Sequence, residues 1–135
     1  MSEIINPQDA ELEEIILGSC LIESKAITLI ADILRPEAFY NEKNLEIYAT
    51  LQSMYRNGQK IDIITVKEEL ARRGKLEFIG GPYTLAHISG RVASSAHLEY
   101  HARILKQKYI RRETILGFHK LLALAADETT DKIGR

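Results

Sequence analysis

The spacing of two histidines comes nearest to a reactive site in this sequence. His97 and His101 are four residues apart with Glu99 between them, so a helix would place both imidazole rings on one face. The zinc-protease pattern H-E-x-x-H instead has its glutamate directly after the first histidine, and no third ligand is evident here. We therefore interpret this pair as helix-surface or interface histidines, and the isolated His87 and His119 as structural residues.

The other residues with chemical potential also fall short of a catalytic or cofactor site. Cys20, the only cysteine, could act as a nucleophile only beside a histidine, and we interpret it as a small buried core residue. Gly74-Lys75 fails the phosphate-binding loop pattern, since Glu69 stands where the first glycine of that pattern belongs. Gly80-Gly81 lacks the third glycine and the preceding strand of a dinucleotide site. We expect no catalytic residue, no cofactor and no metal in this chain.

Length and composition predict one soluble, folded domain. The chain has 135 residues, and domains usually span about 100–200. With 45% hydrophobic and 27% charged residues, the chain is expected to be neither a disordered protein nor a small domain stabilised by disulfides. A single cysteine and an acidic start without a signal-peptide core indicate a cytoplasmic location. The longest apolar run, Leu121–Ala126, is far below the roughly 18 residues that a membrane span needs, so membrane insertion is not expected.

Helix caps and apolar periodicity predict an all-α fold, with a small bundle of about five helices over residues 1–93. Apolar residues recur at three- and four-residue steps, and capping residues or proline precede each stretch. The predicted helices run from Asn6-Pro7 to Glu23, from Ser24 to the residue before Pro36, from Asn41 to Gly58, from Asp62 or Thr65 to Gly74, and from Gly81-Pro82 to Gly90. The β-branched run 61–66 suits a strand as well, but it has no second strand to pair with and is interpreted as helical.

The last predicted helix is longer than the rest of the chain can cover. It begins at Ser94 or Ser95, ends at about Ala126 and is followed by a polar tail over residues 127–135. A helix of about 31 residues is about 46 Å long, whereas a domain of about 100 residues has a radius of gyration of about 13 Å. The long helix over residues 94–126 is therefore expected to project from the bundle.

Both halves of this long helix carry an apolar stripe. Steps of four, three and four residues separate the apolar positions of the first half, which are Leu98, Ala102, Leu105 and Tyr109. The stripe of the second half has nothing in the chain to cover it, which favours a partner helix or another subunit. The candidate interface residues are Tyr109, Arg111, Arg112, Ile115, Phe118, Leu121, Leu122 and Ala125.

The near-neutral net charge of -1 conceals two charged regions. Residues 1–55 contain three basic and ten acidic residues, whereas residues 91–120 contain seven basic and two acidic ones. Such a basic helix is often a solvated surface. It could also contact nucleic-acid phosphates, or pack on the acidic body of another subunit.

An ordered set of short motifs resembles the N-terminal domain of DnaB-type bacterial replicative DNA helicases. The resemblance covers roughly residues 6–127, and the ordered set is more specific than any one motif. It rests on Glu11 to Leu17-Gly18, on 36–40 (PEAFY), 61–66 (IDIITV) and Glu69-Leu70, on 74–77 (GKLE) and 80–83 (GGPY), and on 100–104 (YHARI) with Arg112. One departure is Asn44, where the family often carries histidine; we interpret this position as a packing or capping site.

The resemblance implies a helical bundle whose long helix is the first arm of a helical hairpin. In the family, hairpins pair subunits, and six N-terminal domains form a collar of three dimers above an ATPase ring. Primase docks on that collar and helicase loaders act there. The resemblance also leads us to expect a second hairpin helix, a linker and a motor domain with ATP and magnesium beyond this chain. The chain alone is expected to be monomeric or weakly associated, and DNA to be bound by the full protein.

Two alternatives remain open at this point. The chain could be an autonomous nucleic-acid-binding module that uses Arg103, Lys106, Arg111 and Arg112, although its aromatic residues are not interleaved with the basic ones. It could also be the related helicase-binding domain of primase, which shares this kind of bundle and hairpin. The run 61–66 and Gly80-Gly81 favour the helicase domain over the primase domain.

Overall fold

A computed structural model describes residues 9–127 of the chain, and all regular structure in that range is helical. The elements are α1 (Ala10–Ile22), α2 (Ile27–Ile30), the 3-10 helix η1 (Pro36–Ala38), α3 (Glu42–Arg56), α4 (Ile63–Arg72), α5 (Pro82–Gly90) and α6 (Leu98–Ala126). The all-α class is confirmed, and the β-branched run 61–66 enters a helix as expected.

Helix α1 is the centre of the body. It packs against α3, α5 and α6, and its Ile16 and Leu17 are completely buried. Gly18 allows the close approach of α5, because a Cβ atom at this position would lie 2.6 Å from the Ile88 carbonyl oxygen and from Val92 Cγ2. The smallest side chain therefore determines how near the two helices lie.

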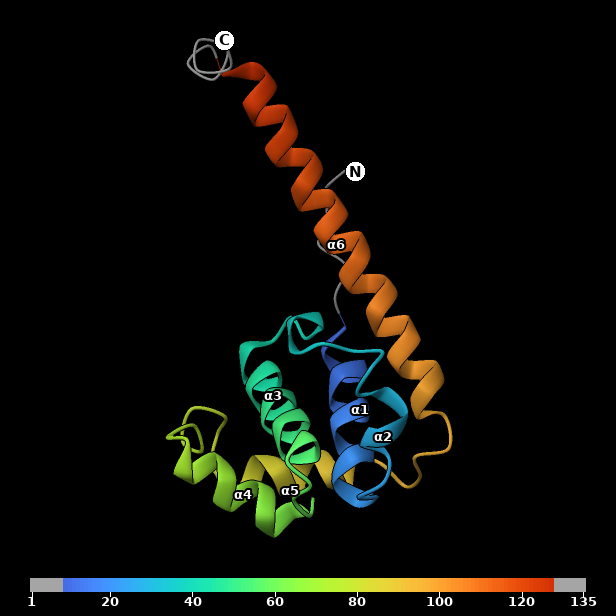
Figure 1. The fold of residues 1–135 in the computed structure, drawn as a ribbon, viewed down its shortest axis with the longest axis vertical. Coiled ribbons are helices and arrows are strands. Elements are labelled where there is room, and N and C mark those ends of the chain that lie inside the picture. The colour runs from blue at the N-terminus through green and yellow to red at the C-terminus, as the bar shows by residue number, and fades with distance from the viewer. Residues whose placement is uncertain (1–8, 128–135) are drawn as a thin grey trace.

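The first half of α6 belongs to this core, and its second half leaves it. Leu98, Ala102 and Leu105 are buried where α6 packs on α1, α2 and η1. The 29 residues of α6 make a helix about 44 Å long. Figure 1 shows its C-terminal half extending beyond the bundle formed by the other helices.

Several predicted caps are confirmed. The Asn41 side chain accepts hydrogen bonds from the backbone N–H groups of Lys43 and Asn44 at the start of α3. At the start of α4, Asp62 and Thr65 form a reciprocal capping box. Pro82 opens α5, and Cys20 lies in the core as expected.

The predicted starts of α1 and α6 are wrong. Asp9, not Asn6, caps α1 by accepting a hydrogen bond from the Leu12 N–H; Asn6 and Pro7 lie outside the described residues. Helix α6 begins at Leu98 because the Ser95 carbonyl accepts from the Leu98 N–H in a preceding turn, while the Ser95 hydroxyl donates to Glu23.

The second predicted helix is much shorter than expected. Helix α2 has four residues and no side-chain cap, so Ser24 does not start it. Side chains of α3 donate hydrogen bonds to backbone carbonyl oxygens that follow α2. Gln52 donates to those of Ala31 and Leu34, and the Tyr48 hydroxyl donates to that of Leu34. These tertiary hydrogen bonds give partners to backbone carbonyl groups of the irregular segment that leads to Pro36, where no helix supplies them.

A buried carboxylate joins α1 to the start of α3. Glu13 is completely buried and accepts hydrogen bonds from the backbone N–H groups of Tyr40 (2.7 Å) and Asn41 (3.3 Å). The Asn44 Nδ2 atom, 3.0 Å away, donates to the same carboxylate. Asn44 is thus a packing residue, in agreement with its interpretation from the sequence, and it holds two helices together.

Replacing Gly18 with alanine should destabilise the fold. The added methyl group must displace the α5 backbone, so Gly18→Ala is expected to lower the free energy of unfolding by about 1–3 kcal/mol. Gly117→Ala in α6 is the matched control, because no atom beyond the adjacent residues and the local helix backbone lies within 4 Å of the added Cβ. It should raise stability by about 0.5–1 kcal/mol through helix propensity. Urea denaturation followed by circular dichroism measures both; equal effects would contradict the close-approach role of Gly18.

Stability should also decrease in acid through Glu69. The hydrogen bonds of Arg72 and Arg73 to its carboxylate lower the pKa of Glu69 to about 2, from an ordinary value of 4.5. The stabilisation is present above pH 4.5 and is lost as the pH falls towards 2, where the folded form is protonated as well. Glu69→Gln should therefore flatten the decrease in urea midpoint between pH 4.5 and 2, whereas Glu68→Gln should leave it unchanged.

Candidate interaction surface

The half of α6 that leaves the body, residues 110–126, is called the arm below. Its surface is unusually apolar for an exposed helix. The large apolar side chains that lie open to solvent are Ile110, Leu116, Phe118, Leu121, Leu122 and Leu124, and Phe118 and Leu121 are 61% and 65% exposed. Nothing within residues 9–127 covers them.

The apolar face of the arm points away from the face that α6 packs on the body. With about 100° between successive residues, the buried Leu98, Ala102 and Leu105 lie on one side of the helix. The centre of the group formed by Phe118, Leu121, Leu122 and Ala125 lies roughly 170° around the helix from them. A helix that covered this outer face would therefore approach from the side opposite the body.

Arg112 anchors the arm at the point where it leaves the body. Although arginine is rarely buried, Arg112 is only 4% exposed, and its Nη2 atom donates to the Ala38 carbonyl oxygen at 3.3 Å. The guanidinium carbon lies 5.2 Å from the centre of the Tyr40 ring and 5.5 Å from that of Tyr109. Two cation–π contacts and a hydrogen bond thus hold the last residue of α6 that is buried in the body.

The predicted interface residues therefore separate into two groups. Phe118, Leu121, Leu122, Ala125 and Arg111 are exposed on the arm, and Ile115 is half-buried. Arg112 is buried beneath the half-buried Tyr109 and serves the junction within this chain, not the exposed face. Sequence reasoning missed Ile110, Leu124 and the junction residue Tyr40, although helical spacing places Ile110 beside the apolar stripe.

The basic surface of α6 is smaller than its sequence indicates. Of the four cations considered for nucleic-acid binding, Arg112 is buried and Arg103 pairs with Glu99 at 2.9 Å. Lys106 and Arg111 are the two that remain exposed without an ion pair to any described residue.

Other potential reactive groups are not arranged for chemistry in the described residues. His97 precedes α6 and its ring lies 6.3 Å from that of His101, and no cluster of three potential metal ligands occurs between residues 9 and 127. Burial raises the pKa of the Cys20 thiol to about 12, so the nucleophilic thiolate is not populated near neutral pH. No helix in this range is long and apolar enough to cross a membrane.

Comparison with known proteins gives a consistent result. A model of the family described as DnaB-like helicase N terminal domain matches residues 5–107. A replicative DNA helicase DnaB of Rhodothermus marinus is 43% identical over 108 residues, which are 80% of this chain and 12% of that protein. The replicative DNA helicase DnaC of Bacillus subtilis (strain 168) is 34% identical over 119 residues, 85% of this chain and 26% of its own length. The chain thus spans at most about a quarter of these relatives.

Solved structures agree with the sequence relatives. The crystal structure of the N-terminal domain of DnaB helicase from Mycobacterium tuberculosis is similar with a TM-score of 0.87 and 30% identity, over 93% of this chain and 91% of that one. A structure titled as a DnaB-like replicative helicase and its interactions with primase has a TM-score of 0.73 and 30% identity. It covers 83% of this chain and 26% of that one.

The two adjacent arginines at the base of the arm, Arg111 and Arg112, should contribute differently to the free energy of unfolding. Arg112→Met removes the donor to Ala38 and both ring contacts, so it is expected to lower the free energy of unfolding by about 1–3 kcal/mol. Arg111→Met, on the exposed side, should change it by less than about 0.5 kcal/mol. Urea denaturation measures both changes.

The same pair tests whether Arg112 sets the direction of the arm. Spin labels at Gln59→Cys and His119→Cys report the distance between the body and the arm. The distance distribution should broaden with Arg112→Met and stay narrow with Arg111→Met. A distribution unchanged by Arg112→Met would show that other contacts orient the arm.

Proposed function

The chain belongs to the family of DnaB-like helicase N-terminal domains, and from this premise we propose that it is the oligomerisation and partner-docking domain of a hexameric replicative DNA helicase. In this role the long helix is the first arm of a helical hairpin. Paired hairpins join six such domains into a collar of three dimers. The collar receives primase and the helicase loader.

The exposed outer face of the arm is the observation that carries this proposal. Burying a large aliphatic or aromatic side chain contributes about 1.5–3 kcal/mol, and three such residues, Phe118, Leu121 and Leu122, share this face. A neighbouring helix would remove this area from water. Because the face points away from the body, its partner can be a hairpin helix or another subunit without displacing any described contact.

Docking of primase is supported by a relative. One similar structure is titled as a DnaB-like replicative helicase and its interactions with primase. The part of that chain that matches this one is 26% of its length. We place primase and the loader on the collar surface, without assigning their contact residues.

ATP hydrolysis and DNA unwinding belong to the parent protein in this proposal. The 135 residues contain no phosphate-binding loop pattern, while the matched relatives are called replicative DNA helicases and are about four to eight times longer than the matched segment. We assign ATP and magnesium to a separate motor domain. DNA is then bound mainly by the full protein.

The two alternatives are less well supported. An autonomous nucleic-acid-binding module would have Lys106 and Arg111 as its remaining exposed, unpaired cations on the proposed face. The helicase-binding domain of primase is disfavoured because the matching family model and the sequence relatives are those of the helicase.

The arm is tested by placing charge on its apolar face in the full-length protein. Phe118→Asp combined with Leu122→Asp should prevent self-association, because two carboxylates in a packed helical interface are strongly unfavourable. Light scattering should then report a mass well below that of the unmodified oligomer. Leu29→Asp with Ile64→Asp is the control, since both side chains are exposed on the body. An unchanged mass for the arm variant would overturn the proposed interface.

A further inference from the structure

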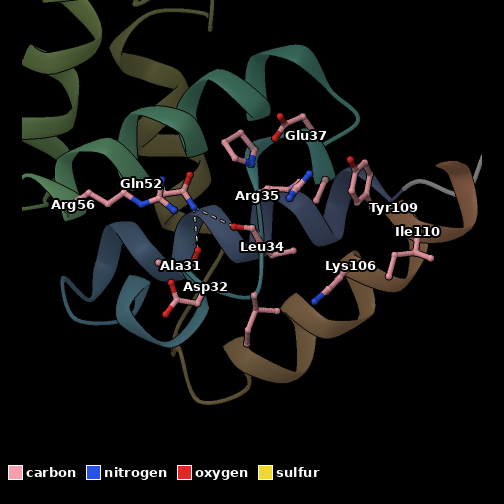
Figure 2. Close-up of a pocket in the computed structure, with 13 residues that line it drawn as sticks. Ala31, Asp32, Leu34, Arg35, Glu37, Gln52, Arg56, Lys106, Tyr109 and Ile110 are labelled. Carbon is pink, nitrogen blue, oxygen red and sulfur yellow. Dashed lines mark hydrogen bonds between the residues drawn. The ribbon is translucent and has the colours of Figure 1, made fainter.

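A groove beside the base of the arm has no role in the function proposed above. It is formed by the segment 31–38 between α2 and α3, by Gln52 and Arg56 on α3, and by Lys106, Tyr109 and Ile110 on α6. Its volume is about 670 Å³, within the range of about 300–1,000 Å³ that is usual for ligand sites. Figure 2 shows these three parts of the chain facing one another across the groove.

The floor of the groove holds a fixed hydrogen-bond acceptor. Gln52 is only 7% exposed, and its Nε2 atom donates to the carbonyl oxygens of Ala31 (3.0 Å) and Leu34 (3.2 Å). These bonds fix the orientation of the amide, because its other atom, Oε1, could not donate to a carbonyl. No described residue donates to Oε1, although Gln52 lines the groove. A fixed acceptor that stays accessible and has no partner among the described residues favours a ligand that carries N–H groups.

The rim of the groove carries three cations that lack partners. Arg35, Arg56 and Lys106 are exposed, and none of them forms an ion pair or hydrogen bond with any residue between 9 and 127. In contrast, Arg72, Arg73, Arg91 and Arg103 are each paired with a carboxylate. In Figure 2 Lys106 extends from α6 towards the facing segment, and Arg35 lies on the other wall.

Apolar side chains also line the groove. Leu34, Pro36, Tyr109 and Ile110 line the groove, and Ile110 is 51% exposed. The groove therefore combines a fixed, accessible acceptor with apolar and cationic side chains.

We propose that this groove binds an acidic, partly apolar peptide segment of a partner protein in extended conformation. A backbone N–H of the peptide donates to Gln52 Oε1, and its Asp or Glu side chains pair with Arg56, Lys106 and Arg35. An apolar side chain of the peptide rests on Tyr109 and Ile110. Extended peptides suit such a site because successive side chains point to alternate walls, and the groove offers cationic and apolar side chains to receive them.

The same features disfavour nucleic acid as the occupant. Asp32 and Glu37 also line the groove without ion pairs to described residues, and a phosphate backbone, which is charged at every nucleotide, would meet them in any register, whereas a peptide can keep its acidic residues away from them. The sugar-phosphate backbone of DNA offers no donor to Gln52 Oε1, so only a base could bind it, whereas every peptide unit except that of proline offers a backbone donor. A peptide can also place a basic residue beside Asp32 or Glu37.

The test begins with a phage-displayed library of random twelve-residue peptides selected on the 135-residue chain. Enriched peptides should place Asp or Glu next to apolar residues. The tightest peptide, labelled with fluorescein, should lose roughly tenfold or more in affinity for the variant Arg56→Glu with Lys106→Glu, measured by fluorescence anisotropy. Reversing the charges of the peptide should restore its binding to that variant and remove its binding to the unmodified chain.

Matched variants make the outcome decisive. Lys25→Glu with Lys43→Glu makes the same change in net charge at two exposed sites outside the groove, and should leave the affinity within about twofold. Thermal unfolding checks that all variants are folded. Equal binding to the groove variant, or failure to enrich any peptide, overturns the proposal. Binding of a 20-nucleotide single-stranded DNA that the groove variant alone abolishes would also overturn it, in favour of a nucleic-acid site.

The groove and the arm are separable in this experiment. The groove variant should retain the oligomeric mass of the full-length protein, since neither Arg56 nor Lys106 lies on the arm. Failure of the peptide test leaves the proposed role of the arm intact, and failure of the arm test leaves the groove intact.

Discussion

The length of α6 relative to its small body is the constraint on which the other features depend. A helix about 44 Å long cannot be covered by six shorter elements, so the environment of its side chains must change along its length. The first half buries Leu98, Ala102 and Leu105 in the core, and the second half exposes Phe118, Leu121 and Leu122. The two apolar faces lie on opposite sides of the helix, so one face folds into the core and the other stays open for the association proposed above.

Buried polar groups hold the joints between elements. Glu13 links α1 to the start of α3 through Asn44, Gln52 fixes the segment after α2, and Arg112 fastens α6 to Ala38 and the ring of Tyr40. A buried charge is costly unless it is hydrogen-bonded, so such groups specify one arrangement more sharply than apolar contacts do. For Arg112 the consequence is geometric, because a small change of angle at the junction displaces the far end of the arm much more than its base.

The two candidate surfaces meet at Ile110. This residue ends the wall of the groove and begins the exposed apolar surface of the arm. The chemistry differs on either side of it. The arm offers apolar area with few charges, as helix packing requires, whereas the groove offers a fixed acceptor and unpaired cations, as peptide recognition requires. In the proposed collar, one surface would thus bind other subunits and the other surface a different partner.

The amino-acid sequence by itself determined the features that are local along the chain. Helical spacing and caps such as Asn41 and Asp62 predicted the helices, because these signals act within a few residues. The apolar stripe of Phe118 and Leu122 predicted the exposed arm for the same reason. Only the tertiary structure decided that Arg112 is an internal anchor, although its neighbour Arg111 is exposed. It also decided that Gln52 binds the carbonyl groups after the short helix α2 and presents an acceptor in a groove. Both outcomes depend on residues 18 to 74 positions away in the chain, whose approach is set by packing and leaves no periodic trace in the sequence.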